Sequence, residues 1–276
     1  MSTRTVRTQA EFDQAITDKI DLITVDGDPA TPHEWVDVGD DSCGSVVEAR
    51  GTGRVRLHGS ARIEAHDRSQ VQTYDASRVA AHDDSSIQAH DSSSVIANDR
   101  SLVAAIDTTH VSCYDTTDVR AGDSCDIQAF GSSHVGASDG TVVAAHDTSE
   151  VVAYGSANVA AMDDSTVYAS GFVAVSAFDN AHVKATGSSH AELHGRSTAD
   201  AYHSSTVVVH DDAEATVHHL AVTATADGDG SILRADDADL PDADPVPPSG
   251  EVYVPAGTTT TKNGQTVTRR AYRRKR

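Results

Sequence analysis

Aromatic residues are scarce in this chain, because they make up only 4% of its 276 residues, with a single Trp and four Phe. A large globular core is normally built around bulky side chains, so this composition excludes one. The chain also lacks an apolar run long enough to cross a membrane, and we expect no membrane partner. Any core must therefore be thin and built from small or β-branched residues.

Cysteine and cationic residues are also few. The three cysteines, Cys43, Cys113 and Cys125, are odd in number and do not suggest a disulfide framework. The first residues lack the basic and then apolar pattern of a secretory signal, so we expect synthesis in a reducing cytoplasm. The net charge of -21 argues against nucleic acid as a partner of the main body.

What the chain does contain is an eight-residue repeat. Every eighth residue from Val47 to Val183 is Val or Ile, and the register continues through Ala191 and Ala199 to Val207. Two residues further on comes a small residue, mostly Ala, then Asp or Gly after two more, and then Ser, Thr or Ala. A fixed short period predicts a stacked array, because one repeat cannot bury its own apolar face.

Each octad is expected to be one short strand followed by one corner. The alternation Val-x-Ala is the period of a strand, with Val and Ala on one face. Asp and Gly tolerate the left-handed backbone of a tight turn, and a nearby hydroxyl can bind the backbone there. A helix is excluded, because its apolar face would need spacings of three and four residues.

Sixteen residues per coil is the simpler reading of the corner residues. Asp and Gly alternate there over one stretch: Asp147, Gly155, Asp163, Gly171, Asp179, Gly187. Two octads per coil give two facing parallel sheets, and the alternative is a triangular coil of three octads. We therefore predict an all-β fold, a parallel β-solenoid of about sixteen residues per coil. Right-handed winding is the default for parallel crossovers.

Residues 1–46 are interpreted as a cap on the solenoid of residues 47–226. Thr8 and Glu11 form a capping box that begins a short helix. An open end of a solenoid exposes sheet edge and core, so a covering helix is expected there. The only Trp, Trp35, is expected to plug that end.

The composition changes after the repeats end. Residues 227–250 are acidic and rich in proline, which is typical of an extended linker. Residues 251–276 contain Asn263-Gly264, a hairpin signal, so we expect a C-terminal hairpin followed by a basic tail. Seven cations and Glu251 give this segment a charge of +6, and since the whole chain carries -21, the rest carries -27. The tail residues predicted to dock on a partner are Arg269, Arg270, Arg273, Arg274, Lys275 and Arg276.

The repeat supplies many polar residues, but none in an irregular catalytic arrangement. Asp recurs at one corner position and is interpreted as a backbone-binding corner residue, so no catalytic residue and no cofactor are predicted. Cys113 and Cys125 replace inward Ala and Ser and are read as small buried residues. In a sixteen-residue coil one His stacks over the next, about 5 Å away, and we favour a surface ladder over a transition-metal site. The histidines concerned are His66 over His82 and His194 over His210.

Two segments carry a resemblance to a known family. The repeat as written in Ser92-Ser93-Ser94-Val95-Ile96-Ala97-Asn98-Asp99 resembles that of octapeptide-repeat β-solenoid proteins of actinobacteria and their tailed phages. The opening Thr5-Val6-Arg7-Thr8-Gln9-Ala10-Glu11-Phe12-Asp13 is also similar to the start of such proteins. The resemblance covers roughly residues 1–225 and implies a rigid spacer or display element of a virion. It brings no catalytic motif.

The leading interpretation is a non-enzymatic structural or binding protein, made in the cytoplasm and incorporated into a virion as a tail or capsid appendage. Its partner would be a protein, with nucleic acid bound only through the basic tail, and an oligomer is compatible with this role. An intracellular acidic mimic of DNA is the alternative. A carbohydrate-active β-helix enzyme would need a repeat-breaking loop that carries acids, and no long loop interrupts residues 47–215.

Overall fold

The computed structural model describes residues 1–27, 34–42 and 44–235, with Asp41 described by its backbone only, and the backbone of four strands between residues 251 and 275. The chain divides into two compact units, Met1–Val142 and Val143–Arg276. Both units are stacks of parallel β-coils with about sixteen residues per coil, which confirms the predicted fold class. No helix in the described ranges is long and apolar enough to cross a membrane.

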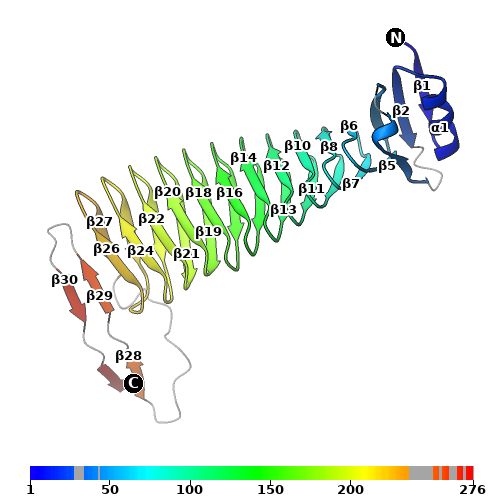
Figure 1. Ribbon diagram of the computed structural model, residues 1–276. Helices are drawn as coiled ribbons and strands as arrows, with labels where there is room; N and C mark the ends of the chain where they lie inside the picture. The colour runs from blue at the N-terminus through cyan, green and yellow to red at the C-terminus, as the bar shows by residue number, and fades with distance from the viewer. Residues whose placement is uncertain are drawn as a thin grey trace. The chain divides into compact units, whose positions relative to one another are not determined.

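Unit 1 contains two facing parallel sheets, here called sheet A and sheet B, and successive strands of the chain alternate between them (Figure 1). Sheet A contains β1 (Thr3–Val6), β2 (Leu22–Gly27), β4 (Val46–Gly51), β6 (Arg62–Ala65), β8 (Arg78–Ala81), β10 (Ser94–Ala97), β12 (His110–Cys113) and β14 (Asp126–Ala129). Sheet B contains β3 (Val36–Val38), β5 (Arg54–Leu57), β7 (Gln70–Thr73), β9 (Ser86–Ala89), β11 (Leu102–Ala105), β13 (Asp118–Ala121) and β15 (His134–Ala137).

The register between neighbouring strands settles the size of the coil. Val95 of β10 pairs with Val79 of β8 on one side and with Val111 of β12 on the other. Each step is sixteen residues, so a coil contains two octads, and the three-octad alternative is wrong. Identical repeat positions therefore stack directly, Val on Val and Ala on Ala.

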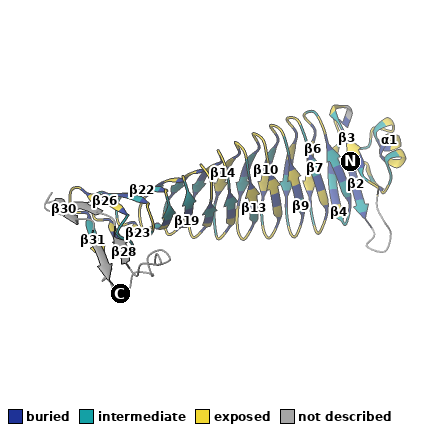
Figure 2. Ribbon diagram, turned by 90° about the horizontal axis from the view of Figure 1, so that it is seen from below, coloured by how far each residue is buried: buried dark blue, intermediate teal, exposed yellow. Residues whose placement is uncertain are grey.

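The core is the thin layer between the two sheets. Inward Val, Ala and Ser positions are buried along the coils, while the positions between them are partly or fully exposed (Figure 2). Cys113 and Cys125 are both buried at the inward Ala and Ser positions, as predicted. Some inward hydroxyls also stabilise the corner, as the Ser101 hydroxyl donates to the carbonyl of Asn98 at 2.7 Å.

The N-terminal region is part of the coil stack as well as its cover. Helix α1 (Gln9–Thr17) begins after Thr8, whose hydroxyl accepts from the Glu11 N–H at 3.3 Å. The Glu11 carboxylate reaches back to the Arg7 N–H at 2.7 Å, one residue before the predicted partner. Strands β1, β2 and β3 already pair in parallel within sheets A and B, and a short 3-10 helix (Asp40–Ser42) precedes β4. Parallel pairing thus begins before the predicted boundary at Val47.

Unit 2 repeats the architecture with two further sets of stacked strands. One set contains β16 (Val142–Ala145, which begins at the last residue of unit 1), β18 (Asn158–Ala161), β20 (Ala174–Ala177), β22 (His190–Leu193), β24 (Thr206–Val209) and β26 (Thr223–Ala226). The other contains β17 (Glu150–Ala153), β19 (Thr166–Gly171), β21 (His182–Gly187), β23 (Thr198–Ala201), β25 (Glu214–Val217) and β27 (Ser231–Arg234). Because β27 pairs with β25, the coils continue beyond the predicted boundary at Ala226.

The C-terminal residues form four short strands: β28 (Glu251–Val254), β29 (Gly257–Thr260), β30 (Thr266–Arg269) and β31 (Tyr272–Lys275). Strands β29 and β30 pair antiparallel, as a hairpin requires, and β29 also pairs in parallel with β26. Strand β28 pairs antiparallel with β31. The predicted turn residues Asn263 and Gly264 lie outside the described residues.

Candidate functional site

The corner Asp residues are structural ligands of the backbone, as predicted. Asp99, with φ of 60°, adopts the left-handed conformation shared by the other corner Asp residues. One carboxylate oxygen of Asp99 accepts from the N–H of Asp83, one coil earlier, at 3.1 Å. Asp115 receives the same bond from the N–H of Asp99 at 3.2 Å, and the pattern continues along both edges of unit 1. These acids stabilise the stack of corners.

The predicted histidine stacks are present. The ring centroids of His66 and His82 lie 5.0 Å apart, and those of His194 and His210 lie 4.6 Å apart, with nearly parallel planes. Tyr and Phe occupy equivalent positions in other coils, as in the stack of Tyr114 on Phe130. Among the described residues, no group of three or more His, Cys, Asp or Glu side chains is arranged to hold a metal ion. The stacked rings form aromatic ladders at the corners.

The buried thiols give a testable prediction. Burial raises the pKa of Cys113 to about 11, and burial also raises the pKa of Cys125. A thiol with a raised pKa stays protonated at pH 8, and only the thiolate reacts with a disulfide reagent. In a Cys43→Ser background we expect neither thiol to react with Ellman's reagent over minutes, and both to react after denaturation. Titration at the rate of a free cysteine would show that these side chains do not point inward.

Trp35 does not plug the core, in contrast to our expectation. It precedes buried Val36 by one residue, so strand alternation places its half-buried side chain on the outer face of sheet B. There the Arg54 and Arg56 guanidiniums lie 5.9 Å and 4.9 Å from the ring centroid. The Trp35 ring thus packs beneath two cations.

The predicted docking residues of the tail are placed by their backbone alone. Arg269 ends β30, while Arg273, Arg274 and Lys275 lie within β31. The register pairs Glu251 with Lys275. Arg270 and Arg276 lie outside the described residues.

A feature that the sequence analysis missed is a hollow in the outer face of sheet A, between β4 and β6. Most neighbouring strands pair along their whole length, but β4 and β6 pair only through Glu48–Ala49 and Glu64–Ala65. The starts of the two strands separate and leave a hollow of about 530 Å³, which continues into a second one of about 470 Å³ beside it. The residues that line both are Ser45, Arg62 and Arg78.

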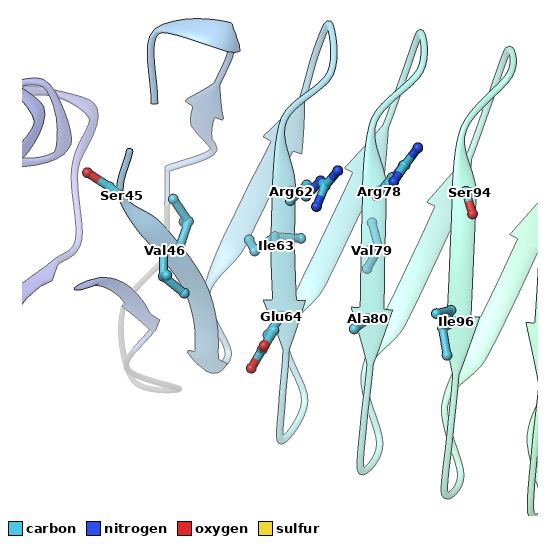
Figure 3. Close-up of a pocket in the computed structure, with 11 residues that line it drawn as sticks. Ser45, Val46, Arg62, Ile63, Glu64, Arg78, Val79, Ala80, Ser94 and Ile96 are labelled. Carbon is cyan, nitrogen blue, oxygen red and sulfur yellow. The ribbon is translucent and has the colours of Figure 1, made fainter. Parts of the chain in front are cut away.

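Arg62 and Arg78 dominate the electrostatics of this hollow. The two residues are register partners on β6 and β8, and both side chains are exposed. Figure 3 shows the two guanidiniums extending in the same direction from adjacent strands, with Val46 of β4 across the hollow. Within the described part of the chain, no carboxylate forms an ion pair with either of them.

Glu64 lines the hollow and Asp40 lines the one beside it, but neither forms an ion pair with an arginine among the described residues. Glu64 lies 3.6 Å from His66, a contact that is an ion pair only when the imidazole is protonated, and the nearby Glu48 accepts from Arg50 at 2.8 Å. The Asp40 carboxylate accepts from the backbone N–H of Ser60 at 2.6 Å and from the hydroxyl of Ser60 at 2.7 Å, and these bonds keep the Asp40 pKa below its ordinary value. The arginine pair is thus free to receive an external anion.

A local signal for this surface was present in the sequence. Between residues 47 and 80 there are six arginines and four acids, a net charge of +2 in a chain of -21. No family model matches the chain, and no match was found among curated proteins or solved structures.

Proposed function

We propose that this protein is a non-enzymatic spacer or display element of a phage virion, carried as a tail or capsid appendage. The observation that carries the proposal is the regularity of the coils: four-residue strands and four-residue corners recur with little interruption in both units. A stack of this kind sets a distance in proportion to the number of its coils, which is what a spacer needs.

The environment of the acids supports a non-catalytic role. Catalytic carboxylate pairs work because two acids sit in unlike surroundings. Here the corner acids repeat one environment, in which a carboxylate oxygen accepts a backbone N–H from the preceding coil. The same bonds favour a structural use of the acidic residues over mimicry of DNA.

Attachment is assigned in this proposal to residues 251–276. Their charge of +6 contrasts with -27 for the preceding residues, so they are suited to an acidic protein surface. Nucleic acid is the alternative partner of the same cations. Exposed charges are screened within about 8 Å at physiological ionic strength, so salt should weaken the attachment.

The test compares the full chain with a chain lacking residues 251–276. Mass spectrometry and immunogold labelling of purified particles should detect the full chain in the virion. The shortened chain should be lost from particles yet remain folded, because the coils up to β27 pair with one another and β29 joins β26 only through Ala224 and Thr259. Its β signal in circular dichroism should fall only by the contribution of the deleted strands β28 to β31. A full chain absent from particles would refute the virion role. A shortened chain that is still incorporated would refute the role of the tail.

A further inference from the structure

We infer that the hollow between β4 and β6 is a docking site for an extended acidic peptide segment of a protein partner. This site would add the chemistry of a partner to the proposed function. It rests on that function in one respect only, namely that the partner is a protein. Three observations carry it: an open backbone edge, an uncompensated arginine pair and exposed aliphatic side chains around them.

The backbone edge of β6 is open at its first residue. In the following coils this residue donates its N–H to a carbonyl seventeen positions earlier, as Arg78 does to Ala61 at 2.9 Å and Ser94 does to Ser77 at 3.0 Å. Among the described residues, the equivalent bond from the Arg62 N–H to the Ser45 carbonyl is absent, since β4 and β6 do not pair at this point. An unpaired strand edge is a template for an extended peptide, whose main chain can complete the missing bonds.

The arginine pair specifies a carboxylate. Register partners in neighbouring strands lie about 4.8 Å apart, so the positive charges of Arg62 and Arg78 are close together without a carboxylate between them. A guanidinium offers paired N–H donors that match both oxygens of a carboxylate. One acidic side chain of an added peptide can thus reach both guanidiniums and relieve their repulsion.

The apolar residues specify what flanks the acid. Val46 and Ile96 are 48% and 50% exposed, and both line the hollow, above the nearly buried Ile63. Side chains of an extended peptide alternate between two faces, so aliphatic residues can contact this rim while an acid one or two positions away reaches the arginines. The hollow is therefore suited to a peptide that mixes Val or Ile with Asp or Glu.

The charge of the rest of the chain favours such a peptide over a nucleic acid. A long polyanion laid across unit 1 would meet the acidic corners on either side of the hollow, whereas a short acidic peptide would not. The hollow also offers no described aromatic ring on which a base could stack, because Trp35 lies on the other sheet beneath Arg54 and Arg56.

The test uses the full-length protein and a fluorescein-labelled, end-blocked peptide, Ser-Val-Asp-Val-Glu-Ser, followed by fluorescence anisotropy at low salt. We expect saturable binding that the double substitution R62Q/R78Q weakens by about tenfold or more, because charge-assisted hydrogen bonds are lost. Arg120→Gln is the matched control, since Arg120 is an exposed arginine of β13 outside the hollow, and it should change the affinity by less than about twofold. Equal binding by the double variant and the parent would overturn the inference.

Two further arms identify the ligand. The same peptide with Asn and Gln in place of Asp and Glu should not bind, and equal binding would overturn the role of the arginines. Inorganic phosphate or a short single-stranded oligonucleotide that displaces the peptide at matched charge concentration would show a general anion site and overturn the peptide assignment. Circular dichroism verifies that each variant is folded, and the single substitutions Arg62→Gln and Arg78→Gln replace the double variant if it unfolds. Because only isolated protein is used, a negative result leaves the virion test unaffected.

Discussion

Replacing Ala105 by leucine should destabilise the protein by about 1–3 kcal/mol, because the interior between the two sheets has no room for a larger side chain. Ala105 is 1% exposed on β11. It stacks between Ala89 and Ala121 of the neighbouring coils in sheet B. The added atoms must push the two sheets apart or force strained rotamers in several coils, since each coil lies only about 4.8 Å from the next.

The control for this substitution is the adjacent residue. Ala104 lies on the same strand, but its side chain is exposed on the outer face of sheet B. Ala104→Leu should therefore change the free energy of unfolding by less than about 0.5 kcal/mol. Urea denaturation of both variants, monitored by circular dichroism, measures the two effects. Equal stabilities would mean that strand alternation does not place Ala105 inward.

The structure of the coil could be predicted from the sequence because nearly every octad has the same residue types at its strand and corner positions. Val, Ala and Asp at fixed spacing set the strand face and the corner, so the inward position of Cys113 and the stacking of His66 on His82 could be predicted. The alternation of Asp163 with Gly171 was also a true sign of a sixteen-residue coil, since successive strands belong to opposite sheets and the corners that follow them lie at opposite edges of the coil.

The repeat could not predict what breaks it. Strands β2 and β3 lack the octad pattern, yet they pair with β4 and β5, which have it, because backbone hydrogen bonds do not require the same side chains. The position of Trp35 was missed because its aromatic character was given more weight than its place one residue before inward Val36. The hollow was missed because it depends on partial pairing of β4 with β6, which no residue type encodes.

The largest effect at a corner is expected from Asp99→Val, at about 2–4 kcal/mol. Asp99 has φ of 60°, a conformation that costs a β-branched residue about 1–3 kcal/mol. The substitution also removes the oxygen that accepts from the Asp83 N–H at 3.1 Å, and a lost hydrogen bond adds about 0.5–1.5 kcal/mol or more. Both costs arise at one exposed residue, where a typical surface substitution has little effect.

A short series separates the two causes. Asp99→Gly tolerates the left-handed backbone but lacks the acceptor, so it should cost about 1 kcal/mol. Asp99→Asn keeps both the tolerance of this conformation and an acceptor oxygen, and it also removes a negative charge beside Asp83 and Asp115, so it should be nearly neutral. Arg100→Val is the control, because it places the same side chain at the next corner residue without positive φ and loses only an exposed ion pair with Asp84. Urea denaturation should rank the variants Asn, Gly and Val in order of increasing loss. If Asn were as destabilising as Val, the corner would depend on the charge of the carboxylate and not on its conformation and acceptor.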